Sequence, residues 1–172
     1  MKELGIVVLV CLLAGCANST VAPTKPALVD NLPSIGELAG TPEAELPEPP
    51  TLDAALVARG QQLYAVHCAS CHGAKLEGEA DWQQPNADGS FRAPPHDATG
   101  HTWHHGDALL LETIRLGGER LPAEIGTSAM PAFSGTLTVD EMDAILTYFK
   151  SSWPADIRAA QWEMTVRSQA NP

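Results

Sequence analysis

The chain has 172 residues, of which 44% are hydrophobic, and a formal net charge of -11. This length allows one domain with appendages rather than two full domains. The excess of acidic over basic residues, 21 against 10, argues against nucleic acid or anionic lipid as a partner and favours a positively charged protein surface.

Residues 1–15 have the pattern of an export signal. Lys2 precedes a short apolar run, and small residues precede Cys16. The run is too short for a permanent membrane span, and small residues before a cysteine suit a peptidase that cleaves ahead of that thiol. The segment resembles a bacterial lipoprotein signal, which predicts that Cys16 becomes the first mature residue and carries acyl chains. The alternative is an ordinary cleaved signal or an uncleaved anchor.

Residues 16–50 are rich in Pro, Ala, Thr and acidic residues and hold seven of the 14 prolines. They show no helical or strand periodicity. A segment of this composition buries too little apolar surface to offset the entropy lost on ordering. We therefore predict a lipidated, disordered tether between a membrane and the folded domain.

The pattern of the next residues predicts a helix. Thr51 is a plausible N-cap, and Leu56, Gly60, Leu63 and His67 fall on one helical face. This helix leads directly into a pair of cysteines.

The pair is Cys68 and Cys71, and His72 follows at once. Two thiols on one helical turn, with a histidine directly after, form the attachment motif of c-type haem. The thiols add to the vinyl groups and the histidine binds the iron. The alternatives are a thioredoxin-like redox pair, which lacks its strand and helix context, and half of a zinc site, which lacks further ligands at a suitable spacing. No structural disulfide is expected, because Cys11 leaves with the signal and Cys16 is lipidated.

Two more helices are predicted in the domain. Residues 73–104 form a long loop that would wrap a cofactor. A helix is expected over residues 106–116 and is stopped by two glycines. After a further irregular stretch, Thr138 and Glu141 form a capping box. An apolar stripe follows them at helical spacing: Met142, Ile145, Leu146 and Phe149.

Residues 154–172 are expected to form a helical extension and a tail. Its helix would run over residues 155–164, with Ile157, Ala160 and Met164 facing the domain. No run of residues has useful strand character, so the fold class is all-α.

These elements resemble class I c-type cytochromes over about residues 52–153, in the haem attachment motif and in the spacing of Gly60, Tyr64 and Cys68. The resemblance implies a cytochrome c domain over residues 51–153, with three to five helices around one covalent haem c. It also implies that Gly60 lets the last helix of the domain cross closely and that Tyr148 packs at this crossing.

The resemblance implies the remaining haem-binding residues. Met130, 58 residues after His72, is the expected second axial ligand, and its neutral thioether raises the reduction potential. The carbonyl of Pro94 or Pro95 would accept the Nδ1 proton of His72. Trp103 would donate its indole proton to a haem propionate, with a plain core aromatic as the alternative.

Four histidines, His96, His101, His104 and His105, lie within ten residues. We interpret them as surface groups or as hydrogen-bond donors near the propionates. The alternative is an additional metal site, with copper as the first candidate because imidazole suits it.

The sequence therefore predicts a monohaem cytochrome, not an enzyme, that carries single electrons between extracytoplasmic redox proteins. It would be lipid-anchored in a bacterial cell envelope, facing the periplasm or the exterior. Its partners would have a basic docking surface. A haem peroxidase or gas sensor is the alternative class, and it requires an open sixth position on the iron, against which Met130 counts.

Overall fold

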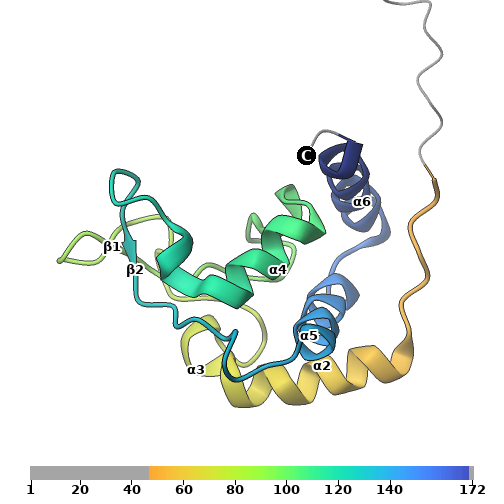
Figure 1. Ribbon diagram of the computed structural model, residues 1–172, viewed down its shortest axis with the longest axis horizontal. Coiled ribbons are helices and arrows are strands. Elements are labelled where there is room, and N and C mark those ends of the chain that lie inside the picture. The colour runs from red at the N-terminus through yellow and green to blue at the C-terminus, as the bar shows by residue number, and fades with distance from the viewer. Residues whose placement is uncertain (1–46, 171–172) are drawn as a thin grey trace, which may run out of the picture. The chain divides into compact units, whose positions relative to one another are not determined.

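The computed structural model describes residues 47–170, which lie in one compact unit. Figure 1 shows their arrangement. The signal segment and Cys16 lie outside the described residues. The elements, in chain order, are α2 (Ala54–His67), α3 (Ala69–His72), β1 (Ser90–Phe91), the 3-10 helix η1 (Thr102–His104), α4 (Asp107–Leu116), the 3-10 helix η2 (Gly117–Arg120), β2 (Thr127–Ser128), α5 (Val139–Ser151) and α6 (Ala155–Ala170).

The predicted all-α fold is confirmed by these helices. β1 and β2 are a parallel pair of two residues each, which the sequence did not predict, and they join two of the long loops. None of the helices within residues 47–170 is long and apolar enough to cross a membrane.

The predicted start of α2 needs correction. Its N-cap is Asp53 rather than Thr51, because the Asp53 carboxylate accepts hydrogen bonds from the amides of Ala55 (2.7 Å) and Leu56 (3.2 Å). Leu56 is exposed. Figure 1 shows that α5 crosses α2 near its middle, so the first turn of α2 lies beyond the crossing.

The crossing of α2 and α5 forms the main helix contact of the domain. A Cβ at Gly60 would overlap the carbonyl oxygen of Ala144 and would lie 2.9 Å from the Cβ of Tyr148. The rings of Tyr64 and Tyr148 also meet, with centroids 5.5 Å apart. The expected roles of Gly60 and Tyr148 are therefore confirmed.

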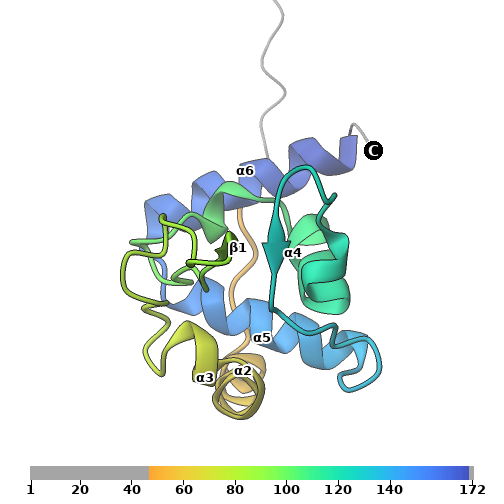
Figure 2. The same cartoon turned by 90° about the vertical axis from the view of Figure 1, so that its left-hand side faces the viewer.

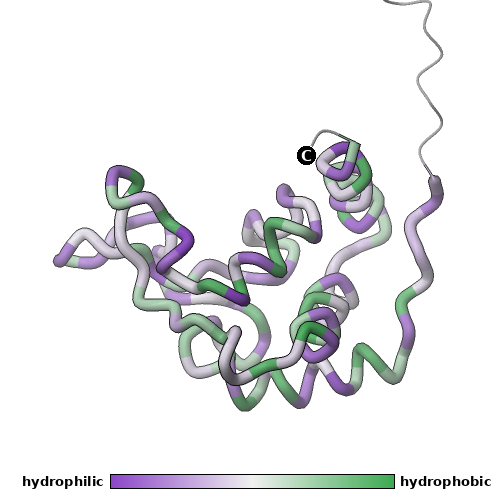
Figure 3. Tube along the Cα trace, in the orientation of Figure 1, coloured by the Kyte–Doolittle hydropathy of each residue, from purple (hydrophilic) through white to green (hydrophobic). Residues whose placement is uncertain are grey.

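The two other predicted helices are confirmed. α4 begins after Gly106 and ends at Leu116, with Gly117 as its C-cap, and α5 has the predicted capping box at its start. Figure 3 shows polar and apolar positions alternating along α2, α4 and α5, as expected of helices with one buried side. The expected stripe of α5 is buried, and it joins α2 and α4 in one core made largely of Leu63, Tyr64, Leu110, Ile114, Met142, Ile145, Leu146, Phe149 and Trp153.

α6 is longer than predicted and buries a different face. Its buried residues are Gln161 and Thr165, and Ile157 packs partly against the core, whereas Ala160 and Met164 are exposed. The apolar pattern gave the wrong face because polar side chains make the contacts of this helix.

The other end of the described chain also contacts α6. The indole nitrogen of Trp162 donates a hydrogen bond to the carbonyl of Pro47 at 2.5 Å. Pro49 and Pro50 line a small hollow together with Trp162. Residues 47–50, which were predicted to belong to the tether, therefore lie along this helix.

Candidate functional site

The attachment motif folds as one helical turn. The amides of Cys71 and His72 both donate to the carbonyl of Cys68, at 3.1 and 3.0 Å. Both cysteines are free thiols, and Cys71 is exposed while Cys68 is partly buried. The two thiols and the histidine are thus presented from one helical turn: Cys71 and His72 lie in α3, and Cys68 is its N-cap.

His72 is held in one orientation and one tautomer. Its Nδ1 lies 2.9 Å from the carbonyl oxygen of Pro94, which has no proton, so Nδ1–H is the donor and Nε2 is the unprotonated nitrogen. His72 is buried, and burial lowers the pKa of its ring against the opposing effects of Pro94 and Glu79. The ring is therefore neutral and presents Nε2, which is the form that binds a metal.

Of the two candidate prolines, the structure assigns this contact to Pro94. The carbonyl of Pro95 instead accepts a hydrogen bond from the Thr102 hydroxyl at 3.2 Å. Pro95 therefore helps to hold η1 and does not orient His72.

Tyr64 holds the other side of the motif, a role that the sequence did not suggest. Its hydroxyl donates to the carbonyl of Gly73 at 2.6 Å, directly after His72. Burial raises the pKa of Tyr64, with further contributions from Cys68 and other neighbouring groups. The phenol therefore keeps its proton and links α2 to the end of α3.

Met130 lies in a loop that is held against the end of α4. Its carbonyl accepts the amide of Gly118 at 2.8 Å, and its own amide donates to the Ser128 hydroxyl at 3.2 Å. Gly117 has a φ of +57°, and a Cβ there would overlap the Pro131 carbonyl. The Met130 side chain packs partly buried against the core.

Three buried side-chain N–H groups within residues 47–170 lack a hydrogen-bond partner: Arg92 Nε, Trp103 Nε1 and Arg120 Nε. All three are donors, and two of them carry a positive charge. A buried donor without a partner costs about 1–3 kcal/mol. Each of these donors is therefore suited to an anionic acceptor. Trp103 was expected here, but nothing in the sequence distinguishes the two arginines from surface residues.

The ring of His96 packs inside the domain and is not a surface group. Its ring stacks on His72 and on Phe149, with centroids 4.2 Å away in each case. Its Nδ1 is 2.9 Å from the Thr102 hydroxyl. Because that hydroxyl donates to Pro95, Nδ1–H of His96 is the donor here.

The other histidines make separate aromatic contacts. His101 stacks on Trp82, and His104 stacks on Trp103. In the part of the chain that the structure describes, no group of three or more His, Cys, Asp or Glu side chains is arranged to hold a metal ion. The alternative of an additional copper site therefore stays a hypothesis that gains no support from these residues.

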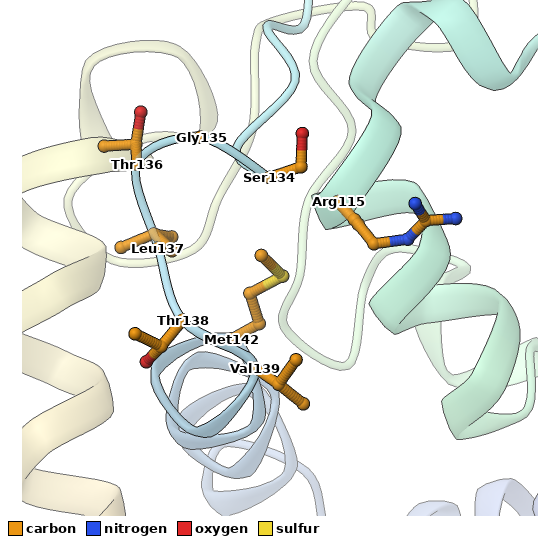
Figure 4. Close-up of a pocket in the computed structure, with 8 residues that line it drawn as sticks. All are labelled: Arg115, Ser134, Gly135, Thr136, Leu137, Thr138, Val139 and Met142. Carbon is orange, nitrogen blue, oxygen red and sulfur yellow. The ribbon is translucent and has the colours of Figure 1, made fainter.

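A surface pocket of about 410 Å³ lies elsewhere, between the end of α4 and the start of α5. Figure 4 shows its lining residues: Arg115, Ser134, Gly135, Thr136, Leu137, Thr138, Val139 and Met142. The lining set does not include the motif residues or Met130. The pocket is therefore separate from the site.

The site defines a class of protein: a helical domain with two free thiols and a neutral, oriented histidine on one turn. Residues 57–153 match the family model described as Cytochrome c, and the chain belongs to this family. No curated protein and no solved structure matches the chain. The family binds haem c covalently, typically one per domain, so the chain is a haem-binding electron-transfer cytochrome.

The residues present fit this cofactor. Haem c needs two thiols, an imidazole nitrogen and partners for its two propionates. α3 and its N-cap Cys68 present the thiols and His72, and the unpaired donors of Trp103, Arg92 and Arg120 are each suited to a carboxylate.

Proposed function

We propose that this protein is a membrane-tethered monohaem cytochrome that carries single electrons between redox partners outside the cytoplasm. One observation carries the proposal. The Nδ1 of His72 donates to the Pro94 carbonyl, which fixes a neutral imidazole on the same helical turn as two free thiols. This is the arrangement of an iron ligand beside two attachment points.

Each residue has a role in this proposal. Cys68 and Cys71 would hold haem c covalently, His72 and Met130 would bind its iron, and Trp103 would donate to a propionate. When bound, the haem supplies an iron centre that changes by one electron. Met130 gives a neutral, soft ligand, which favours the reduced iron.

Cys68 is poorly suited to attack in a thiol redox reaction. Burial, together with the neighbouring Cys71, raises the pKa of Cys68 to about 11. Thiol exchange requires the thiolate, which is scarce at neutral pH for such a group. This supports attachment of haem rather than a thioredoxin-like function.

We further propose that the protein is not an enzyme. If His72 and Met130 both bind the iron, as proposed, no position on the metal would remain for a substrate. Transfer of an electron requires only close approach of a partner to the haem edge.

Tethering rests on the first 50 residues of the chain. The signal pattern and Cys16 indicate a lipoprotein of the bacterial cell envelope, and residues 16–50 would let the domain reach partners above the membrane. The net charge of -11 favours redox partners with a basic docking surface.

Intact-mass measurement and cell fractionation of the native protein test this proposal. We expect one covalent haem and acyl chains on Cys16. Cys16→Ser should lose the acyl chains and keep the haem spectrum, whereas Cys11→Ser, the matched change within the signal, should keep both. A native protein without lipid would refute the anchor, and one without covalent haem would refute the electron-carrier role.

A further inference from the structure

α6 lies beyond the residues that match the family, and its buried side is polar. Gln161 and Thr165 are each only 1% exposed. Buried polar side chains are tolerated when their hydrogen bonds are satisfied, and such bonds specify one arrangement of the elements that they join. The partners of Gln161 and Thr165 therefore indicate what α6 holds in place.

The Gln161 side chain reaches the segment between η1 and α4. Its Nε2 donates to the carbonyl of His105 (3.1 Å) and to Asp107 Oδ1 (2.7 Å), and it also lies 3.1 Å from the Thr165 hydroxyl. The Thr165 hydroxyl accepts from the Asp107 amide and donates to its carboxylate, both at 3.1 Å. Two residues of α6 thus bind the backbone and side chain at the start of α4.

Asp107 extends this network to α5. Its Oδ2 pairs with Lys150 Nζ at 2.6 Å, and both side chains are largely shielded from solvent, with exposed fractions of 22% and 14%. The carboxylate is therefore bound from α5 on one oxygen and from α6 on the other. Removal of the α6 contacts leaves Asp107 with Lys150 alone.

α6 also lies close to Gly106, in the segment between η1 and α4. A Cβ at Gly106 would lie 2.6 Å from the Ser168 hydroxyl and 3.2 Å from the Cα of Thr165. A side chain at Gly106 would therefore crowd α6. Figure 2 shows α6 running along the edge of the domain that carries η1 and α4, on the side away from α2.

We propose that α6 is a brace for η1, and that Gln161 is a positioning residue for Trp103. Trp103 lies in η1, two residues before the carbonyl that Gln161 binds, and its buried indole N–H lacks a protein partner. By fixing the His105 carbonyl and Asp107, α6 holds η1 in the position from which this indole would donate to a haem propionate. The role toward haem depends on the proposed function, but the brace itself does not.

Hydrogen exchange and redox titration of the holoprotein test the proposal. Gln161→Leu is compared with Gln169→Leu, the same change at an exposed position of the same helix. Loss of two or more hydrogen bonds should raise amide exchange across residues 101–107 by roughly tenfold or more in the Gln161 variant. Its reduction potential should fall, because a propionate without its donor favours the oxidised iron. The Gln169 variant should match wild type in both measurements.

Thr165→Val serves as a second, milder variant, since it removes the hydroxyl and preserves the shape. It should raise exchange in the same residues by a smaller factor. Unchanged exchange over residues 101–107, or an equal rise in α2 and α5, would overturn the brace. Faster exchange with an unchanged potential would overturn the role of Gln161 in positioning Trp103. A wild type without covalent haem would refute the proposed function and leave the exchange comparison intact.

Discussion

The ring of His72 lies against the ring of His96, with centroids 4.2 Å apart and planes inclined by 27°. Phe149 of α5 stacks on the opposite side of the His96 ring. Burial, with contributions from His72 and His101, holds the pKa of His96 well below its usual range, so this ring is neutral. His96 therefore lies between Phe149 of α5 and His72, the residue that is proposed to bind iron.

Replacing His96 with alanine should lower the free energy of unfolding by about 2–4 kcal/mol, because it leaves a cavity between two rings. His101→Ala, at an exposed position, should cost less than about 1 kcal/mol. Denaturant unfolding of both holoproteins measures the difference. Equal losses for the two variants would show that the stacking of the His96 ring does not contribute specifically to the free energy of unfolding.

Gly60→Ala should destabilise the protein by about 3 kcal/mol, because the added methyl group would overlap the backbone carbonyl of Ala144. A rotamer change cannot relieve a clash with backbone, so α2 and α5 must separate. Gly135→Ala is the matched control, since a Cβ there has no heavy atom within 4 Å. Similar stability of both variants in thermal unfolding would contradict the observed closeness of the crossing.

Met130→Ala should keep the covalent haem and open the sixth position of the iron, because the thioether bonds only to the metal. The reduction potential should fall and ferrous carbon monoxide binding should increase. Met142→Ala is the matched control: Met142 is a core residue of α5, so its loss should reduce stability without increasing carbon monoxide binding. Equal carbon monoxide binding by wild type and Met130→Ala would refute Met130 as a ligand.

Stability should fall as the pH drops below about 6.5, in part through His101 and His105. Burial lowers the pKa of both rings, and repulsion from His104 adds to the effect in each. The unfolded chain therefore takes up these protons at higher pH than the folded protein. Stability is full above about 6.5, falls below it, and levels off beneath the lowered pKa values.

A His101→Gln, His105→Gln double variant should lose less stability than wild type between pH 7.5 and pH 5. Denaturant unfolding at the two pH values measures this. Parallel losses in the two proteins would show that other groups cause the acid sensitivity.

Local signals explain what the sequence predicted well. The attachment motif, the capping box at Thr138 and the two glycines after Leu116 each depend on neighbours within a turn, so the helices that they begin or end were predicted nearly to the residue. The crossing at Gly60 came from a family resemblance and was also confirmed.

Partners distant in sequence explain what was missed. The buried face of α6 is set by Asp107 and the His105 carbonyl, more than fifty residues earlier, which no helical periodicity reveals. The choice of Pro94 over Pro95 likewise depends on how the loop folds around His72. Arg92 and Arg120 gave no sequence signal, because an unpaired buried nitrogen exists only once the loops are packed.

The hydrogen bond from Trp162 to Pro47 joins the first described residue of the chain to α6. For a chain anchored at Cys16, tension from the membrane would be taken first by α6, before it reached the first turn of α2. In such an anchored chain, the described domain would be connected to its anchor at residue 47, beside α6. The direction in which a tethered domain approaches a partner would then depend on α6 as well as on the length of the predicted tether.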